Sequence, residues 1–360
     1  MKTGNIGLLA VMTVLALASC QKLIVIGGDD DALKLQLNGF IDTADSIHSV
    51  SVMKIGYTSM PVAVGGAKLR CFVNGAFVCE VDTLVDCRDK YREYVRYLRF
   101  KAAINPGDEV FLSADADGMH AEVLENVPAR LPSVHVDTST VVRNAGRGSE
   151  EPAASYRINI GDRPGRDYYR LRILMYEKDS VEEVRADDIY GGYPEVGTVM
   201  AEFSEDLKID KGDEPVLGRG PDYGDASTNG PEQDPYSENA YNIFMDSSFD
   251  GRPYMMTVYT QPFSDIAIKH PMVLFPGVVW HRVTRRVTVR LQAISRDTYY
   301  YIDDYLYDSS SRGLTVDDFY QPYPENVRGG RGLVMFAAST DVAFELPELL
   351  TDDYHDFTIL

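Results

Sequence analysis

Short runs in which apolar and polar residues alternate, separated by turn signals, constrain the fold of this chain most. Residues 33–40 alternate with period two, which is typical of a half-buried strand. Asn74-Gly75 is a strong signal for a two-residue hairpin. Turn signals at 105–108 and at Asp117-Gly118 are each followed by a further strand-like run. The pattern predicts a mainly all-β fold with an N-terminal immunoglobulin-like β-sandwich.

Two cysteines flank the predicted hairpin turn. A two-residue type I′ turn pairs Phe72 with Phe77 and places Cys71 and Cys79 on opposite faces, so that no bridge forms between them. A three-residue turn would instead place Cys71 opposite Cys79. We favour the two-residue turn because it pairs the two phenylalanines across the strands.

The cysteine count leaves the disulfide state open. Besides Cys20, the chain contains Cys71, Cys79 and Cys87, and an odd number leaves at least one thiol unpaired or paired with another chain. No C-x-x-C spacing occurs, and the histidines lie away from the cysteines and from one another. No metal site is therefore predicted from these residues.

The length of the chain favours two domains, because 360 residues exceed what a single hydrophobic core usually fills. Residues 143–152 lack apolar periodicity and are interpreted as a linker or boundary loop. We therefore expect an immunoglobulin-like domain at 33–142 and a larger antiparallel β-rich domain at 155–360. Residues 208–240 are predicted to form a long loop, because Gly, Pro, Asp and Glu dominate there.

The second domain is predicted to contain long strands and one short helix. Residues 168–176 have the composition of a strand, and residues 284–291 alternate with period two. Ser295 is placed to cap a helix at 296–307, with Asp297 in the first turn, where the helix dipole favours an acidic side chain.

The first twenty residues resemble a bacterial export signal. Lys2 precedes an apolar run at 6–16, which is shorter than the roughly 20 residues that a membrane-spanning helix needs. Leu17-Ala18-Ser19-Cys20 resembles the lipobox, in which cleavage precedes a cysteine that is then acylated. We predict a lipoprotein signal peptide at 1–19 and lipid attachment at Cys20, whose two or three acyl chains give a stable anchor. The alternative is an ordinary cleaved signal with a chance cysteine nearby.

Residues 20–32 are predicted to be an acidic tether between the anchor and the first strand. Gln21 favours the outer membrane, because an Asp at this place in the lipoproteins that the chain resembles favours the inner membrane. Asp29-Asp30-Asp31 resembles the surface-export signals of Bacteroidetes lipoproteins, although those usually lie closer to the cysteine. Exposure at the cell surface is therefore expected, with an anchor that faces the periplasm as the alternative.

The charge of the chain excludes one class of partner. It has 35 basic and 55 acidic side chains, which give a net charge of −20. Binding to nucleic acid or to an anionic lipid surface requires basic patches, so neither is expected. Contact with the membrane is expected through the covalent lipid alone.

The motifs of common enzymes and metal sites are absent. The sequence contains no H-E-x-x-H, G-x-S-x-G or Walker loop, so the chain is predicted not to be an enzyme and to need no cofactor. Residues 113–118 partly match a calcium loop, but Leu124 stands where a bidentate Glu is required. A calcium site built from several acidic loops stays an alternative. Residues 328–332 are interpreted as a glycine turn with positive φ and close backbone approach.

Four segments together resemble a known family. They are residues 167–170 (DYYR), 249–254 (FDGRPY), 293–301 (AISRDTYYY) and 324–333 (PENVRGGRGL). In this order, after a lipoprotein signal and a sandwich-like N-terminal half, they resemble the DUF4249 family of Bacteroidetes outer-membrane lipoproteins. We interpret the four segments as structural, since they contain a helix start, a tight turn and aromatic core positions.

The resemblance implies a function in general terms. Members of the family are often encoded beside TonB-dependent outer-membrane transporters, which implies a non-catalytic binding or accessory role in nutrient uptake beside such a transporter. The family supplies no catalytic or ligand-binding residues that could be assigned here, so the ligand and the oligomeric state stay open. The alternative is a structural or adhesive surface protein that binds host or envelope partners.

Overall fold

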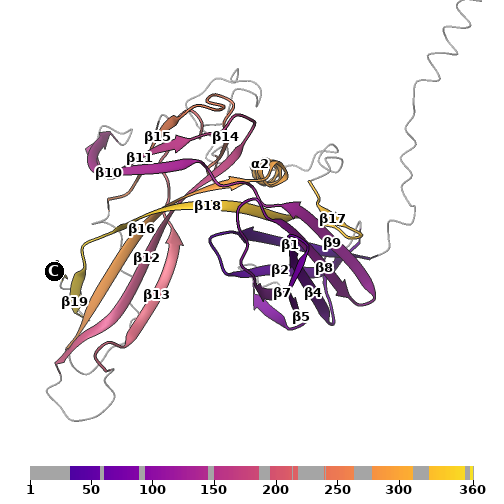
Figure 1. Cartoon of the computed structure of the whole chain (residues 1–360). Coiled ribbons are helices and arrows are strands. Elements are labelled where there is room, and N and C mark those ends of the chain that lie inside the picture. Colours follow the sequence, from indigo (N-terminus) through magenta and orange to yellow (C-terminus); the bar gives the residue numbers. More distant parts are fainter. Residues whose placement is uncertain are drawn as a thin grey trace, which may run out of the picture.

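The computed structural model describes residues 33–56, 61–88, 94–144, 150–185, 195–212, 214–217, 239, 241–262, 278–310, 324–352 and 357–359. Strands dominate this part of the chain, and one α-helix, α2 (Arg296–Ser310), accompanies them (Figure 1). The predicted all-β fold with one short helix is confirmed. No helix among the described residues is long and apolar enough to cross a membrane.

The N-terminal half is a β-sandwich. Its strands are β1 (Lys34–Asp42), β2 (Ile47–Ile55), β3 (Val62–Ala63), β4 (Ala67–Val73), β5 (Ala76–Val81), β6 (Leu84–Arg88), β7 (Tyr94–Lys101), β8 (Glu109–Ala116) and β9 (Met119–Asn126), and β17 (Val327–Arg328) joins them from the C-terminal half. One sheet has the order β1-β2-β7-β6 and the other β17-β9-β8-β4-β5. Without β17, the two sheets have the A-B-E-D and G-F-C-C′ strand orders of immunoglobulin domains. The predicted immunoglobulin-like β-sandwich is confirmed.

The hairpin between β4 and β5 has the predicted turn and an unpredicted bulge. Both residues of Asn74-Gly75 have positive φ (51° and 75°), and Phe72 pairs with Phe77. A bulge between Cys71 and Phe72 then shifts the register, so that Cys71 lies opposite Cys79. The prediction that the two cysteines lie on opposite faces was wrong, because the extra residue of a bulge reverses the alternation of faces.

Both cysteines of this hairpin are free thiols. Cys71 is fully buried and Cys79 is half-buried. Burial raises the pKa of the Cys71 thiol to about 12, and the neighbouring Cys79 adds to the effect. The side chain of Cys87 lies outside the described residues, so its pairing stays open.

One sheet continues from the sandwich into the C-terminal half (Figure 1). β18 (Val334–Glu345) pairs in parallel with β1, from Gly39 opposite Val334 to Asp42 opposite Ala337. Beyond β18 the sheet continues with β16 (Val278–Ile294), β12 (Tyr168–Arg185) and β13 (Val199–Asp206). Three short strands pair outside this order: β14 (Ile243–Met245) with β12, β19 (Leu349–Asp352) with β16, and β20 (Phe357–Ile359) with β19. The two predicted domains thus share a sheet, and their separation at 33–142 and 155–360 stays a prediction.

The predicted linker or boundary loop at 143–152 overlaps the ends of two paired strands, and its residues 145–149 lie outside the described residues. β10 (Ser133–Asn144) and β11 (Glu150–Gly161) pair along their whole length, up to Asn144 opposite Glu150. The strand residues at 143–144 and 150–152 were not predicted because this end of the hairpin is exposed, as the 66% exposure of Val142 illustrates. A strand whose two faces both meet solvent needs no apolar alternation, so its sequence carries no strand signal.

A second sheet covers one face of the large sheet. β10, β11 and β15 (Tyr254–Thr260) form it, and it crosses β16 and β18 (Figure 1). Tyr156 and Ile158 of β11 are fully buried in one core cluster with Ile173 of β12 and Val289 of β16. The period-two pattern at 284–291 predicted a strand with one buried face, and β16 confirms it.

The predicted loop at 208–240 is described at its two ends. Near its start, Asp210 forms an isolated β-bridge with Tyr259 of β15, and Leu217 is fully buried. Residues 213, 218–238 and 240 lie outside the described residues.

The glycine turn at 328–332 makes the close backbone approach that was predicted. Gly329 and Gly332 have positive φ (73° and 103°). A Cβ atom on Gly330 would overlap the carbonyl oxygen of Leu35 in β1. Because only glycine fits against β1 here, the turn closes the junction between the sandwich and the C-terminal half.

Candidate ligand-binding site

The large sheet has an outer face, on the side away from the three-stranded sheet. The helix α2 covers one end of this outer face. Tyr168 of β12, Ile294 of β16 and Ala337 of β18 pack there with Ile302 of α2. The helix begins directly after β16 because Ser295 caps it: the Ser295 Oγ accepts a hydrogen bond from the Thr298 N–H (3.1 Å). The predicted cap is therefore confirmed, and the helix begins at the predicted residue 296.

A cavity of about 450 Å³ lies beside this apolar cluster. Its size falls within the range of small-molecule sites, roughly 300–1,000 Å³. We call it the Arg170 pocket, and its lining residues come from β1, β12, the segment before β14, α2 and β18: Phe40, Arg170, Tyr241, Tyr301, Ile302 and Met335. Among the described lining residues, the polar groups are the tyrosine hydroxyls and one guanidinium, and the rest is aromatic, aliphatic or thioether.

Arg170 supplies the charge of the pocket, and it takes part in no ion pair among the described residues. Its guanidinium carbon lies 5.8 Å from the ring centres of both Phe40 and Tyr241. Its Nε is buried and has no hydrogen-bond partner in the described part of the chain. Burial lowers the pKa of the guanidinium and the positive charge of Arg172 lowers it further, whereas the negative charges of Asp206 and Asp42, which form no ion pair with it, raise the pKa.

The neighbouring arginines on the same face are paired. Arg172 donates two hydrogen bonds to Asp206 (2.9 and 2.8 Å), and Arg290 donates two to Asp341 (2.9 and 2.8 Å). Bidentate pairs of this kind hold the planar guanidinium in place and neutralise it. Arg170 lacks such a carboxylate among the described residues, so its guanidinium keeps donors for another group.

A buried polar network lies next to Arg170 on the adjacent strand. Gln292, which is opposite Arg170 in the β12–β16 register, is fully buried and donates from Nε2 to Asp42 (2.6 Å). Ser339 donates to the same carboxylate oxygen (2.7 Å). The Oε1 atom of Gln292 has no partner among the residues that the structure describes. The Nε donor of Arg170 and the Oε1 acceptor of Gln292, both without a described partner, thus belong to residues that pair across β12 and β16.

This arrangement suits a molecule with an anionic head and an apolar body. A guanidinium gives strong, charge-assisted hydrogen bonds to a carboxylate. The rings of Phe40 and Tyr241 and the thioether of Met335 offer apolar contact area around it.

A buried His–Asp pair lies elsewhere on the large sheet. The Nδ1 of His281 in β16 is 2.9 Å from the Oδ1 of Asp179 in β12, and the two side chains are 5% and 0% exposed. A catalytic imidazole must reach the proton that it transfers, and burial closes this one to solvent. The absence of catalysis stays a prediction.

The structure brings two of the four resemblance segments to the pocket. Arg170 ends the segment 167–170, and Tyr301 ends the segment 293–301. We interpreted both segments as structural from the sequence, and each also supplies a pocket wall. An arginine directly after two buried tyrosines was the one signal that could have singled out Arg170.

The predicted lipid-attachment residue, Cys20, lies outside the described residues, as do the signal peptide at 1–19 and most of the tether. Attachment at Cys20 therefore stays a prediction. Phe40, Tyr241 and Met335 were missed because they meet Arg170 only after strands from both halves have paired.

The sequence of the chain matches the model of a known protein family. The family described as "Domain of unknown function (DUF4249)" matches residues 23–342. The chain belongs to the DUF4249 family. The match includes all six residues that are described as lining the Arg170 pocket. No curated protein matches the chain.

Proposed function

We propose that this DUF4249 protein is a non-catalytic binding protein that captures an anionic small molecule in the Arg170 pocket. The lipobox at 17–20 supports an anchor on Cys20 in the outer membrane, with the folded part at the cell surface. The family resemblance supports a place beside a TonB-dependent transporter, which would take up the captured molecule.

The observation that carries the proposal is the largely buried guanidinium of Arg170, which has no carboxylate partner among the described residues. Removing a charge from water without a partner is unfavourable. A carboxylate that enters the pocket would supply the partner. One guanidinium balances one negative charge, so a monocarboxylate fits this apolar pocket better than a dianion does.

Calorimetric titration of the full chain with phenylacetate and with octanoate tests the ligand class, and 2-phenylethanol serves as an uncharged analogue. A hydrogen bond to a charged group contributes about 1.5–3 kcal/mol, so we expect an acid to bind at least about tenfold more tightly than the alcohol. Arg170→Gln should remove this preference. Arg172→Gln should retain it, because Arg172 lies on the same strand but is already paired with Asp206.

Three results would contradict the proposed ligand class. They are no binding of either acid, equal binding of phenylacetate and 2-phenylethanol, and an unchanged preference in Arg170→Gln. Tighter binding of a phosphate monoester than of either acid would replace the carboxylate by a phosphate.

The transporter partner has a separate test. We expect a tagged pull-down from detergent-solubilised outer membrane of the native host to recover a TonB-dependent transporter in stoichiometric amount. The control is a known transporter–lipoprotein pair that survives the same preparation. Recovery of this chain alone, while the control pair survives, would refute a stable complex and would favour adhesion or independent binding.

A further inference from the structure

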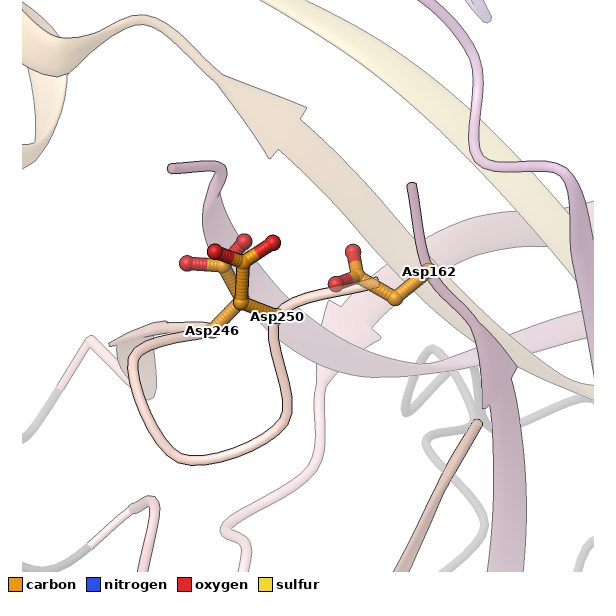
Figure 2. Close-up of side chains that lie close together, drawn as sticks. All are labelled: Asp162, Asp246 and Asp250. Atoms are coloured by element: carbon orange, nitrogen blue, oxygen red, sulfur yellow. The ribbon is translucent and has the colours of Figure 1, made fainter. Parts of the chain in front are cut away.

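Three aspartates converge at a second place, behind the strand that carries Arg170. Asp162 directly follows β11, and Asp246 and Asp250 lie in the connection from β14 to β15. Figure 2 shows the three side chains close together, on two separate stretches of chain. One carboxylate oxygen from each aspartate lies within 4.8 Å of the other two.

Three of the six carboxylate oxygens accept hydrogen bonds that connect the two loops. The backbone N–H groups of one loop donate to the aspartates of the other: Gly251 to Asp162 (2.9 Å), Gly165 to Asp250 (2.8 Å) and Asp167 to Asp246 (2.9 Å). The Tyr169 hydroxyl also donates to Asp162. These bonds leave room for a cation, because each carboxylate oxygen has two lone pairs.

Asp246 is the buried member of the three aspartates. Its side chain is 1% exposed, and its Oδ1 has no hydrogen-bond partner among the described residues. Burial raises the pKa of Asp246, and the negative charges of Asp162, Asp167 and Asp250 raise it further. The nearby Arg163 donates to Asp167 (3.1 Å). A buried carboxylate among other carboxylates is unfavourable unless a cation or a proton neutralises it.

We propose that Asp162, Asp246 and Asp250 bind a calcium ion that holds the β11–β12 and β14–β15 connections together. The ligand set consists of carboxylate oxygens, without His or Cys, and this suits a hard cation. Calcium lies about 2.3–2.6 Å from its oxygens, so oxygens on opposite sides of the ion are about 4.6–5.2 Å apart. Three carboxylate oxygens that lie within 4.8 Å of one another can all reach a single ion at such distances.

Calcium fits the site better than magnesium. Magnesium requires near-ideal octahedral geometry and retains several waters, whereas calcium accepts irregular loops. Extracellular calcium modules bind with dissociation constants of about 10⁻⁴–10⁻³ M, and three carboxylates place this site near that range. An ion would therefore be bound outside the cytoplasm, where calcium reaches such concentrations.

The test is calorimetric titration of the full chain with calcium chloride, after removal of metals with EDTA. We expect one ion per chain and a calcium-dependent rise in the unfolding temperature. Asp246→Asn and Asp250→Asn should each weaken binding at least about tenfold, because each removes one negative ligand. Asp86→Asn is the matched control, since Asp86 is 58% exposed and pairs with Arg96 away from the site. It should bind calcium as the wild type does.

Absence of calcium binding up to about 5 mM, above the range of extracellular modules, would overturn the proposal. So would equal affinity for magnesium, or unchanged calcium binding in both aspartate variants. If Asp246→Asn fails to fold, Asp250→Asn decides, because the Asp250 side chain is exposed. Anion binding by the Arg170 pocket is measured independently, so either site can fail alone.

Discussion

Replacement of Gly330 by alanine tests the junction between β1 and the C-terminal half. A Cβ atom on this residue would overlap the carbonyl oxygen of Leu35 and would lie 2.9 Å from the Cβ of Ala121. The Leu35 oxygen also accepts a hydrogen bond from the Arg331 N–H (2.8 Å). This oxygen therefore cannot move away from the new methyl group without loss of that bond.

The expected cost combines two effects. Overpacking of a well-packed site costs about 1–3 kcal/mol. Loss of the backbone hydrogen bond adds about 1 kcal/mol. We therefore expect Gly330→Ala to lower the free energy of unfolding by about 2–4 kcal/mol.

Urea unfolding, followed by the fluorescence of the single tryptophan, Trp280, measures this difference. Gly66→Ala is the matched control, because no atom lies within 4 Å of a Cβ added at Gly66. It should change the stability by less than about 0.5 kcal/mol. If Gly330→Ala lowers the free energy of unfolding by less than about 1 kcal/mol, and the slope of that free energy against urea concentration is unchanged, the crowding argument is refuted.

Cysteine and histidine chemistry provides three further tests. Cys20→Ala should abolish labelling by palmitate and release the chain from the membrane fraction, and continued labelling would contradict the lipobox interpretation. Because burial raises the pKa of Cys71 to about 12, iodoacetamide at about pH 8 should alkylate half-buried Cys79 first in the folded chain, and equal labelling in peptide mass spectra would refute this. The hydrogen bond to Glu122 raises the pKa of His120 above 6.5. The stabilising effect of this hydrogen bond is therefore complete at lower pH and is lost as the pH rises through the raised pKa. An NMR titration of His120 should give a midpoint above 6.5, and Glu122→Gln should lower that midpoint.

Features that depend on neighbours in the sequence were predicted correctly. The Asn74-Gly75 turn, the Ser295 cap and the glycine turn at 328–332 each follow from the conformations that a few adjacent residues allow. The immunoglobulin-like order followed because its strands are short, alternate in polarity and are separated by clear turn signals.

Features that depend on distant residues, or on exposure, were not predicted. The bulge at Cys71 is a one-residue irregularity without a composition signal, and it reversed the expected faces of the hairpin cysteines. The strand ends at 143–144 and 150–152 lack apolar alternation because this end of the hairpin is exposed. The Arg170 pocket combines five segments that meet only in the folded chain, so its lining could not be predicted from the sequence.

The parallel pairing of β1 with β18 has a consequence for biogenesis. The Asn38 side chain accepts a hydrogen bond from the Leu333 N–H, and 295 positions separate the two residues. A chain that is synthesised from its N-terminus supplies β1 early and its neighbour β18 much later. Until then β1 presents an open strand edge, which invites pairing with other chains. The large sheet therefore cannot be completed until β18 (Val334–Glu345) is available to pair with this edge.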